Sequence, residues 1–306
     1  MTKTDIDYCS VCPRCCKTDR KSASGFCGKS EVMEISGARP HYWEEPCISG
    51  ENGSGTVFFT GCNLGCVFCQ NYAISHHGAM GKIADADYLI EIALLLKEKG
   101  VNNINLVTPT HFTEQLIPVL PILKEEVGLP IVWNSSAYEK TETLKKLDGI
   151  IDIYLPDLKF YSSDVSARYC NAKDYFTVAI KAIEEMLRQK PKNIIGGGGI
   201  MTEGVIIRHM VLPSHTLDSI KILKAVKEYF GNEVRLSIMC QYVPEGNAGD
   251  YPEINRRLKR KEYERVTKTA LKLGFESSYI QDFASADESY IPEFSIIKKQ
   301  SKKNVG

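Results

Sequence analysis

The apolar positions of the chain follow two spacings that alternate after residue 55. Short runs rich in β-branched and aromatic residues are typical of buried strands, and longer stretches with apolar residues every three or four positions are typical of helices. The predicted strands are Val57–Phe59, Asn103–Val107, Leu129–Trp133, Ile150–Leu155, Val205–Leu212 and Val234–Met239. The predicted helices are Ala86–Lys99, Thr113–Glu125, Glu139–Leu147, Asp174–Gln189, Leu217–Tyr229 and Lys261–Leu273.

Repeated strand–helix units predict an α/β fold with a parallel sheet and right-handed crossovers. Six units are fewer than a closed eight-fold barrel has, so we expect a partial (βα)6 TIM-like barrel with functional residues at the carboxyl ends of its strands. We assign the barrel to residues 56–297. Residues 1–55 read as a small irregular cysteine-rich module, and the basic, polar residues 298–306 as a disordered tail.

Polar side chains follow or end five consecutive predicted strands. They are Thr108, Thr110 and His111, then Asn134 and Ser136, then Asp157 and Lys159, then Arg208 and His209, then Gln241 and Tyr242. Any one of them could cap a helix or form a solvated ion pair. Because the carboxyl ends of parallel strands meet at one edge of the sheet, the five sets together predict a common binding site.

The segment that follows the first predicted strand, GCNLGCVFCQN, places Cys62, Cys66 and Cys69 in a C-x3-C-x2-C spacing. Gly61 and Gly65 carry no side chain that would prevent the loop from wrapping closely around a metal centre. Three thiolates are one fewer than the four that normally close a [4Fe-4S] cluster, so one iron would stay open to bind a small molecule. An incomplete zinc site and three buried thiols are the alternatives.

A second group of cysteines lies near the amino terminus of a chain that contains eleven. Cys9, Cys12, Cys16 and Cys27 have a spacing that suits a tetrahedral thiolate site, and Cys15 could replace Cys16. Zinc and an auxiliary iron–sulfur cluster both fit. We favour zinc, because so small a module needs a metal to fold. A set of free thiols is the alternative.

Composition restricts the class of protein. Of 306 residues, 43% are hydrophobic and 25% charged, which is ordinary for a globular protein. Lys plus Arg equals Asp plus Glu, at 38 each, so no overall field favours nucleic acid or an anionic membrane. The first residues lack an apolar signal core, and no apolar run approaches the length that spans a bilayer. We therefore expect a cytoplasmic protein.

These motifs together resemble the radical S-adenosylmethionine (SAM) superfamily. The chain is most similar to the pyruvate formate-lyase activating-enzyme-like branch, and within it to uncharacterised members with an N-terminal cysteine motif. The corresponding stretches are CPRCC, EEPCISG, GSGTVFFTGCNLGCVFCQN, NINLVTPTH, LDGIIDIYLPDLKF, IIRHMVLPS and MCQYVPEG. The resemblance implies a [4Fe-4S] cluster on the C-x3-C-x2-C cysteines, SAM as its ligand, and a flavodoxin- or ferredoxin-type protein as reductant.

The resemblance also implies roles for individual residues. Phe68 matches the aromatic position of the cysteine signature and is expected against the adenine. Asp157 and Lys159 match a pair that contacts the methionyl part of SAM, and Arg208 matches a cofactor-side arginine. The remaining cofactor candidates are Thr108 and Thr110, at the position of a Gly-Gly-Glu-Pro-like turn in relatives, together with Asn134, Ser136 and Gln241.

The substrate is expected to be polar, because the residues left to line its space mix carboxylates, imidazoles and phenols. They are His41, Glu44, Glu45, His111, Tyr138, His209, Gln241 and Tyr242. We expect residues 1–55 to cover the barrel mouth and the reaction to be hydrogen abstraction from a polar small molecule or a protein or peptide residue. The alternatives are an enzyme that installs a glycyl radical on a partner and, less favoured, a metal-stabilised binding protein without catalytic activity.

Overall fold

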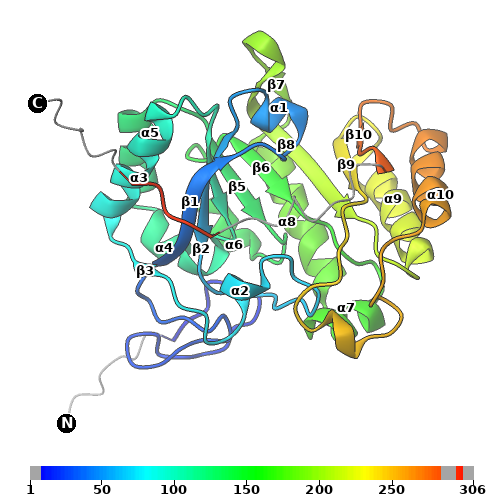
Figure 1. Cartoon of the computed structure of the whole chain (residues 1–306), viewed down its shortest axis with the longest axis horizontal. Helices are drawn as coiled ribbons and strands as arrows, with labels where there is room; N and C mark the ends of the chain where they lie inside the picture. Colours follow the sequence, from blue (N-terminus) through cyan, green and yellow to red (C-terminus); the bar gives the residue numbers. More distant parts are fainter. Residues whose placement is uncertain (1–7, 284–293, 299–306) are drawn as a thin grey trace, which may run out of the picture.

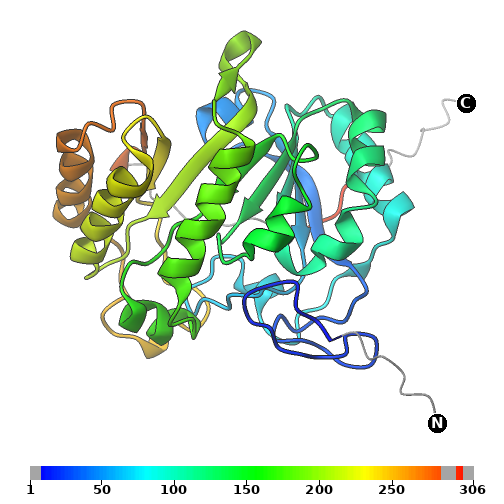
Figure 2. The same cartoon turned by 180° about the vertical axis from the view of Figure 1, so that it is seen from behind.

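The computed structural model describes residues 8–283 and 294–298. A curved, mainly parallel sheet lies inside, and the long helices cover its outer face (Figure 1, Figure 2). Within the described residues the strand order is β10-β9-β8-β6-β5-β4-β2-β1-β3, with β7 paired to β8. Strands β1 and β10 are not paired with each other in this order, so the barrel stays open on one side.

The strands are short, as expected for a parallel sheet whose two faces are buried. They are β1 Glu34–His41, β2 Ser54–Phe59, β3 Lys82–Ile83, β4 Ile104–Val107, β5 Ile131–Ser135, β6 Ile153–Pro156, β7 Ile194–Ile195, β8 Met201–Met210, β9 Arg235–Met239 and β10 Tyr279–Ile280. The helices are α1 Pro46–Ser49, α2 Tyr72–Ser75, α3 Ala86–Glu98, α4 Thr113–Leu116, α5 Leu120–Val127, α6 Thr141–Lys145, α7 Ser163–Cys170, α8 Tyr175–Gln189, α9 Thr216–Phe230 and α10 Arg260–Lys272. Three-residue 3-10 turns lie at Thr110–Phe112, Gly197–Gly199 and Ala248–Asp250.

The predicted α/β architecture is confirmed. The six strands expected from the apolar runs are β2, β4, β5, β6, β8 and β9, and each pairs in parallel with its neighbour. The helix expected over residues 113–125 is divided into α4 and α5 between its two prolines, which cannot donate backbone hydrogen bonds. Helix α7 was not predicted, because its sequence SDVSARYC has no apolar period.

The description of residues 1–55 as irregular is wrong for Glu34–His41. This segment forms β1, which pairs antiparallel to β2 along the sheet. Ile35 and Ala38 are fully buried, but Gly37 and Arg39 interrupt the alternation of apolar and polar residues. The sequence pattern therefore does not predict a strand here. Residues 294–298 lie beside β1, where the Ala38 amide donates to Ser295. A disordered tail was predicted for residues 298–306. Only residue 298 of this segment belongs to the described residues, and residues 299–306 lie outside them.

The core lies between the sheet and the outer helices. Trp133 on β5 and Tyr154 on β6 are fully buried, and α8 turns Ala179, Ile183 and Met186 inward. Burying an apolar side chain of this size stabilises a fold by roughly 1.5 to 3 kcal/mol. No helix in the described part of the chain is long and apolar enough to cross a membrane.

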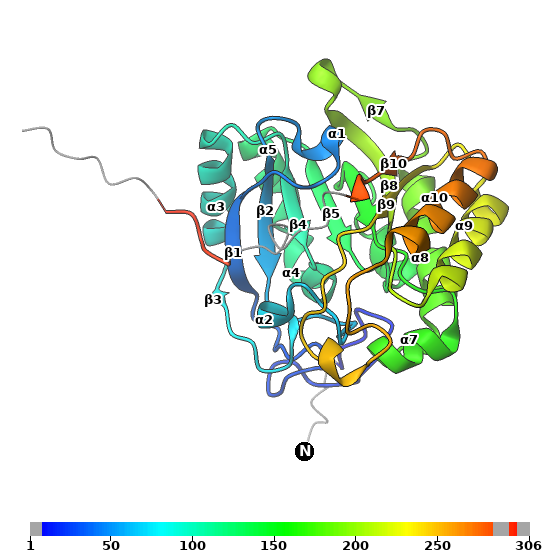
Figure 3. The ribbon, with the colours of Figure 1, turned by 45° about the vertical axis from the view of Figure 1, so that its right-hand side comes forward.

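The parallel strands all direct their carboxyl ends to the edge of the sheet where α2 lies (Figure 3). The loop after β2, which carries Cys62, Cys66 and Cys69, runs beneath this edge toward α2. The cysteine-rich residues 8–30 lie at the same end of the molecule (Figure 1). The fold therefore brings both groups of cysteines to the end of the barrel where the strand-end side chains gather.

Candidate active site

The cysteine loop depends on two glycines with left-handed backbones. Gly61 has φ +85° and Gly65 has φ +68°. A Cβ on Gly61 would lie 2.5 Å from the carbonyl oxygen of Cys27, so a side chain would collide with the neighbouring module. The amide of Cys62 donates to the same carbonyl at 3.4 Å. Glycine is thus required here both for the turn and for the close approach of the two segments.

Backbone hydrogen bonds hold the loop on both sides. The Val67 amide donates to Tyr169 of α7 at 2.9 Å, and the Val67 carbonyl accepts from Asn247 at 2.7 Å. Near the end of the loop, the Gln70 side chain donates to the carbonyl of Gln241 at 2.8 Å. The loop is therefore fixed against the ends of the barrel rather than extended into solvent.

The three cysteines of the loop line one cavity at the carboxyl ends of the strands. The other lining residues come from β1 and the turn after it, from the loop itself and from five strands: His41, Trp43, Glu44, Glu45, Phe58, Leu64, Phe68, Gln70, Asn71, Val107, Thr108, Asn134, Ser135, Ser136, Asp157, Lys159, Arg208, Met210, Met239 and Gln241. We call this the strand-end cavity. It joins the predicted cysteine loop to most of the predicted polar set.

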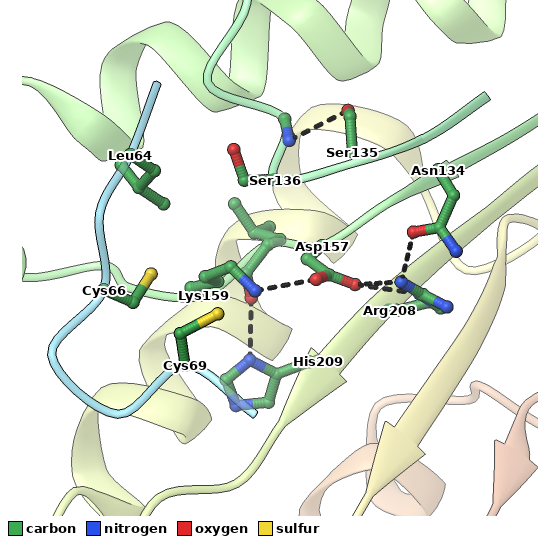
Figure 4. A network of polar contacts seen from close by, with 12 residues as sticks. Leu64, Cys66, Cys69, Asn134, Ser135, Ser136, Asp157, Lys159, Arg208 and His209 are labelled. Carbon is green, nitrogen blue, oxygen red and sulfur yellow. Dashed lines mark hydrogen bonds and ion pairs between the residues drawn. The ribbon is translucent and has the colours of Figure 1, made fainter. Parts of the chain in front are cut away.

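Arg208 is the centre of the polar network in this cavity (Figure 4). Its guanidinium donates to Asp157 and Glu44, each at 2.8 Å, and to the Asn134 side chain at 2.7 Å. Burial opposes its charge, but Asp157, Glu44 and Glu45 outweigh burial and raise the pKa of Arg208 above its usual value. Most of its donors are occupied by protein groups, so the chief effect of Arg208 is to orient these partners.

Lys159 lies between this network and the cysteines. Its ammonium donates to Asp157 at 2.7 Å, and Figure 4 shows Cys66 and Cys69 close to it. Burial lowers the pKa of Lys159, but Asp157 and Cys66 outweigh burial and raise it above the usual range. Burial by itself would raise the pKa of Asp157. The charges of Arg208 and Lys159 outweigh burial and hold the pKa of Asp157 below its usual value. The cavity thus holds a charged lysine beside three thiols.

Phe68 is only 3% exposed and packs edge-on against other aromatic rings. Its centroid lies 6.0 Å from that of Phe160, 6.1 Å from Tyr169 and 5.9 Å from Tyr242. Edge-to-face packing of this kind is a favourable geometry for aromatic pairs. Phe68 also lines the strand-end cavity, so the aromatic cluster forms an apolar wall next to the cysteine loop.

Eight of the nine predicted cofactor contacts line the strand-end cavity, and Thr110 does not. The chain enters a 3-10 turn at this point, and the Thr110 hydroxyl donates to buried Glu139 at 3.0 Å. Glu139 also accepts from Trp133 at 2.8 Å and from Ser135 at 2.6 Å. Thr110 therefore belongs to a buried hydrogen-bond cluster behind β5. Its predicted contact with the cofactor stays a prediction.

Of the residues expected to line the substrate space, His41, Glu44, Glu45 and Gln241 line the strand-end cavity. The other four are packed elsewhere by hydrogen bonds, and each is less than 5% exposed. His111 bonds the carbonyl of Thr60, His209 bonds that of Leu158, Tyr138 donates to Asp174, and Tyr242 donates to Ile254. The two tyrosine hydroxyls are thus satisfied within the protein. Each histidine has one ring nitrogen bonded, whereas Nδ1 of His111 and Nε2 of His209 are buried without a hydrogen-bond partner.

Arg14, within CPRCC, joins the N-terminal module to the cysteine loop. Its guanidinium donates to the carbonyls of Asn63 at 2.8 Å and Leu64 at 3.0 Å in the loop. It also donates to Cys170 at 2.7 Å and to Asn171 at the end of α7. One side chain thus ties three segments together. Nothing in the local pattern indicated this, because the four acceptors are backbone atoms.

The N-terminal thiols are brought near one another. Cys12 interacts electrostatically with Cys27, Cys9 and Cys16, whereas Cys15 is exposed. A Cβ on Gly25 would lie 3.3 Å from the sulfur of Cys16 and 3.6 Å from that of Cys27. Cys9, Cys12, Cys16 and Cys27 therefore lie in one part of the module, but as placed they do not form a group that could hold one metal ion.

The cysteine loop fits a cluster better than a single ion. Among the described residues, no three His, Cys, Asp or Glu side chains stand close enough together to hold one metal ion. A [4Fe-4S] cluster is larger than an ion, and each thiolate binds a different iron, so its ligands stand further apart. Cys62, Cys66 and Cys69 meet this requirement, since they share one cavity and a loop that wraps through two left-handed glycines.

A buried cysteine outside the signature adds to this region. The thiol of Cys170, at the end of α7, lies 3.2 Å from the sulfur of Cys66 and donates to it. No pattern in the sequence indicates a role for Cys170, because it is 104 residues away from Cys66 in a segment without a recognisable motif. Only the packing of α7 against the loop brings the two sulfurs together.

Comparison with known proteins agrees with this geometry. The sequence model of the radical SAM superfamily matches residues 56–210, which include the cysteine loop, Asp157, Lys159 and Arg208. An uncharacterised protein from Methanocaldococcus jannaschii is 33% identical over 288 residues, which cover 91% of this chain and 79% of that protein.

Solved structures share the fold at low sequence identity. Methylornithine synthase PylB matches with TM-score 0.53 and 16% identity over 74% of this chain, and the hydrogenase maturase HydG with 0.54 and 13% over 79%. Streptococcus suis SuiB bound to SAM matches with 0.51 and 16% over 72%. This chain covers 63%, 55% and 47% of those three chains. It belongs to the radical SAM superfamily, whose enzymes use a [4Fe-4S] cluster and SAM.

Proposed function

We propose that this protein is a radical SAM enzyme of the pyruvate formate-lyase activating-enzyme-like branch that abstracts hydrogen from a polar substrate. The observation that supports this most is the shared cavity. The three loop cysteines line it together with Lys159, Asp157 and Arg208, which lie at the ends of two barrel strands. The same cavity therefore offers thiolates for a cluster and charged groups for the amino-acid part of SAM.

In this proposal Cys62, Cys66 and Cys69 hold three irons of a [4Fe-4S] cluster. When bound, the cluster supplies one electron that cleaves SAM to methionine and a 5′-deoxyadenosyl radical, which takes hydrogen from the substrate. Lys159 is placed to pair with the carboxylate of SAM, because its ammonium faces the cavity and is held by Asp157. Arg208 holds Asp157 and Asn134 in position.

The aromatic wall around Phe68 would exclude water from the reacting atoms and contact the adenine. Residues 8–30 pack against the outside of the cysteine loop, and the turn after β1 lines the cavity from the open side of the barrel. This arrangement supports a covered site and a small polar molecule or a protein or peptide residue as substrate. Activation of a glycyl-radical enzyme is the second candidate, since it is typical of the proposed branch, and would need a wider entrance for a partner loop.

The N-terminal thiols complete the proposal. Cys9, Cys12, Cys16 and Cys27 would bind a second metal, zinc in preference to an auxiliary iron–sulfur cluster. Such a metal would hold residues 8–30 in the conformation in which Arg14 reaches the cysteine loop. We further propose a flavodoxin- or ferredoxin-type reductant and a cytoplasmic location.

The test is anaerobic reconstitution with iron and sulfide, followed by reduction and assay of 5′-deoxyadenosine formed from SAM. We expect the wild-type protein to form it and Cys66→Ala to form none. Cys240→Ala removes a buried thiol that does not line the cavity and should behave as wild type. Cluster-loaded wild-type protein that leaves SAM intact under these conditions would refute the enzymatic proposal.

A further inference from the structure

A second cavity of about 500 Å³ opens beside the strand-end cavity. It lies between the turn after β1 and strands β9 and β10, on the side where the barrel is open, and α1 and β10 flank it (Figure 3). We call it the lateral cavity. The two cavities share Trp43, Glu44, Glu45, Met239 and Gln241, so they are adjacent compartments with a common wall. None of the shared residues belongs to the cysteine loop.

Glu45 is the unusual residue of this common wall. It is 7% exposed, and its oxygen Oε2 is buried without a hydrogen-bond partner. Burial raises the pKa of Glu45, and the charge of Arg208 and a hydrogen bond with Ser237 oppose this effect. Adjacent Glu44, in contrast, accepts from Asn105, Asn134 and Arg208. A buried carboxylate oxygen without a donor costs free energy in the folded protein, because it has lost its hydrogen bonds to water and gained none in return. A donor supplied by a ligand would remove this cost.

The backbone fixes Glu45 at this position. Its carbonyl accepts from Ile48 at 2.7 Å and from Ser49 at 3.0 Å, so Glu45 begins helix α1, and Pro46 sets the next turn. The Ser49 hydroxyl also accepts from the amide of Glu44 at 3.0 Å. The two glutamates therefore sit on a rigid turn and cannot easily move apart to find other partners.

The charges around Glu45 favour a cation. The lateral cavity is lined by Glu44, Glu45 and Asp282 and by no lysine, arginine or histidine. In the strand-end cavity, Arg208 also attracts Glu45, but its hydrogen bonds go to Asp157, Glu44 and Asn134. Lys159 is paired with Asp157. His41 carries no compensating charge at neutral pH, because burial, Arg39 and Arg208 lower its pKa to about 4.

The remaining walls suit an organic cation rather than a metal ion. Tyr42 is 53% exposed and Trp43 is 52% exposed, and both line the lateral cavity. Aromatic faces attract ammonium groups and also contact the carbon chain that carries them. A hard metal ion would need several oxygen ligands around one point, and the described residues do not provide such a group.

We propose that Glu45 recognises a substrate with a primary ammonium group, which enters through the lateral cavity and is held at the wall beside the strand-end cavity. This inference rests on the proposed function, since it places the carbon chain of the amine next to the site of SAM cleavage. The ammonium donates to Oε2 of Glu45, and the aromatic side chains at the entrance contact the chain. The ammonium chemistry fits both a free amine and a lysine side chain.

The test measures binding to the reconstituted, SAM-loaded protein by calorimetry. The probes are 1,5-diaminopentane and 1-pentanol, and the capped peptides acetyl-Ala-Ala-Lys-Ala-Ala-amide and its norleucine counterpart. We expect the two amine probes to bind at least about tenfold more tightly than their neutral partners, as the loss of one charge-assisted hydrogen bond predicts. Tighter binding of 1,5-diaminopentane would identify a free amine as the source of the ammonium group, and tighter binding of the lysine peptide would identify a lysine side chain.

Glu45→Gln should remove most of this preference for amines. Glu51→Gln is the matched control, because Glu51 is an exposed acid of the next turn that lines neither cavity. Equal binding of amines and neutral probes by the wild-type protein would overturn the proposal, and that comparison holds even if Glu45→Gln fails to fold. A Glu45→Gln protein that keeps the preference for amines would also overturn the proposal. A Glu45→Gln protein whose main defect is weaker SAM binding would overturn it as well. Formation of 5′-deoxyadenosine without any probe, measured in parallel, reports separately on the proposed function.

Discussion

At the scale of single residues, the site depends on how one acid is shared between two bases. Asp157 accepts from Lys159 through one oxygen and from Arg208 through the other. Removing Lys159 leaves Asp157 paired with Arg208, whereas removing Arg208 would also leave buried Glu44 without its basic partner. The role of Lys159 toward SAM can therefore be separated from its contribution to folding.

Lys159→Met should weaken SAM binding and leave the iron content unchanged. The variant keeps most of the side-chain volume but loses the charge facing the cavity, so we expect affinity to fall by about tenfold to a hundredfold. Equilibrium binding of SAM to the reconstituted protein, with iron analysis of the same sample, provides the measurement. Lys146→Met changes an exposed lysine paired with Glu114 and should bind SAM normally. Unchanged affinity in Lys159→Met would exclude Lys159 as a SAM ligand.

At the scale of secondary-structure elements, two side chains join segments that are far apart in the sequence. Arg14 connects residues 8–30 to the cysteine loop and to the end of α7 through backbone carbonyls. Glu262 connects the start of α10 to the turn before α9, where it accepts from the amide of Ser214 at 2.8 Å. Each side chain bonds several groups at once. Lysine in place of Arg14 keeps the charge, and glutamine in place of Glu262 keeps the size, but neither can form the same set of hydrogen bonds.

Arg14→Lys should loosen the cysteine loop although the positive charge remains. A single ammonium cannot reach the carbonyls of both the cysteine loop and the end of α7, whereas the planar guanidinium does. We expect the free energy of unfolding to fall by about 2 kcal/mol and iron to pass faster to a chelator. The control Arg168→Lys makes the same change at an exposed arginine of α7 that pairs with Glu253. Iron release as slow as in the wild type would show that Arg14 does not support the loop.

Glu262→Gln should lower stability in a pH-dependent way. Arg256 donates to this carboxylate, and it lowers the pKa of Glu262 to about 2 in the folded protein. The unfolded pKa is about 4.3, so the stabilisation is complete above that pH and is lost as pH falls toward 2. We expect the variant to be about 1 to 2 kcal/mol less stable than wild type at pH 7, and this difference to shrink to about half at pH 3.

Urea unfolding of both proteins at several pH values between 7 and 3 provides this measurement. Glu264→Gln is the control, because Glu264 lies on the same helix but is more exposed and only loosely paired with Lys268 at 3.5 Å. A stability difference for Glu262→Gln that stays constant over this pH range would contradict the assignment of the effect to the Glu262 charge.

At the scale of the whole molecule, the two groups of cysteines lie in neighbouring but separate segments. The carbonyl of Cys27 accepts from the amide of Cys62, so the N-terminal module touches the cysteine loop directly. The cavity on the other side of the loop is where Lys159 and Arg208 lie. A metal in the N-terminal module would therefore support the loop from outside, at a distance from the SAM cavity.

Replacing Cys62, Cys66 and Cys69 together by Ala should remove the SAM cluster and leave the N-terminal metal in place. Metal analysis of the purified variant then identifies that metal. We expect about one zinc per chain, whereas about four irons would indicate an auxiliary cluster, because such a cluster contains four. The same analysis on a variant that also lacks Cys9 and Cys12 is the control. Loss of all metal from the first variant would contradict a separate N-terminal site.

The six parallel strands, the long helices and the cysteine loop could be predicted from the sequence because each is encoded locally. Apolar spacing specifies which segments become strands or helices, and the strand-end rule correctly brought Asp157, Lys159 and Arg208 to one cavity. The cysteine signature and its two glycines also lie within a few residues of one another. Such features need only short-range chemistry and a regular topology.

Only the tertiary structure decided which distant groups meet. Strand β1 forms because β2 offers it an edge, and Thr110 turns toward Glu139 because a 3-10 turn intervenes. The contacts of Arg14 with backbone carbonyls and the unpartnered oxygen of Glu45 depend on segments packed against each other from across the chain. Because a hydrogen bond requires atoms within about 3 Å, residue spacing alone cannot predict these contacts, and the packing of the whole molecule determines them.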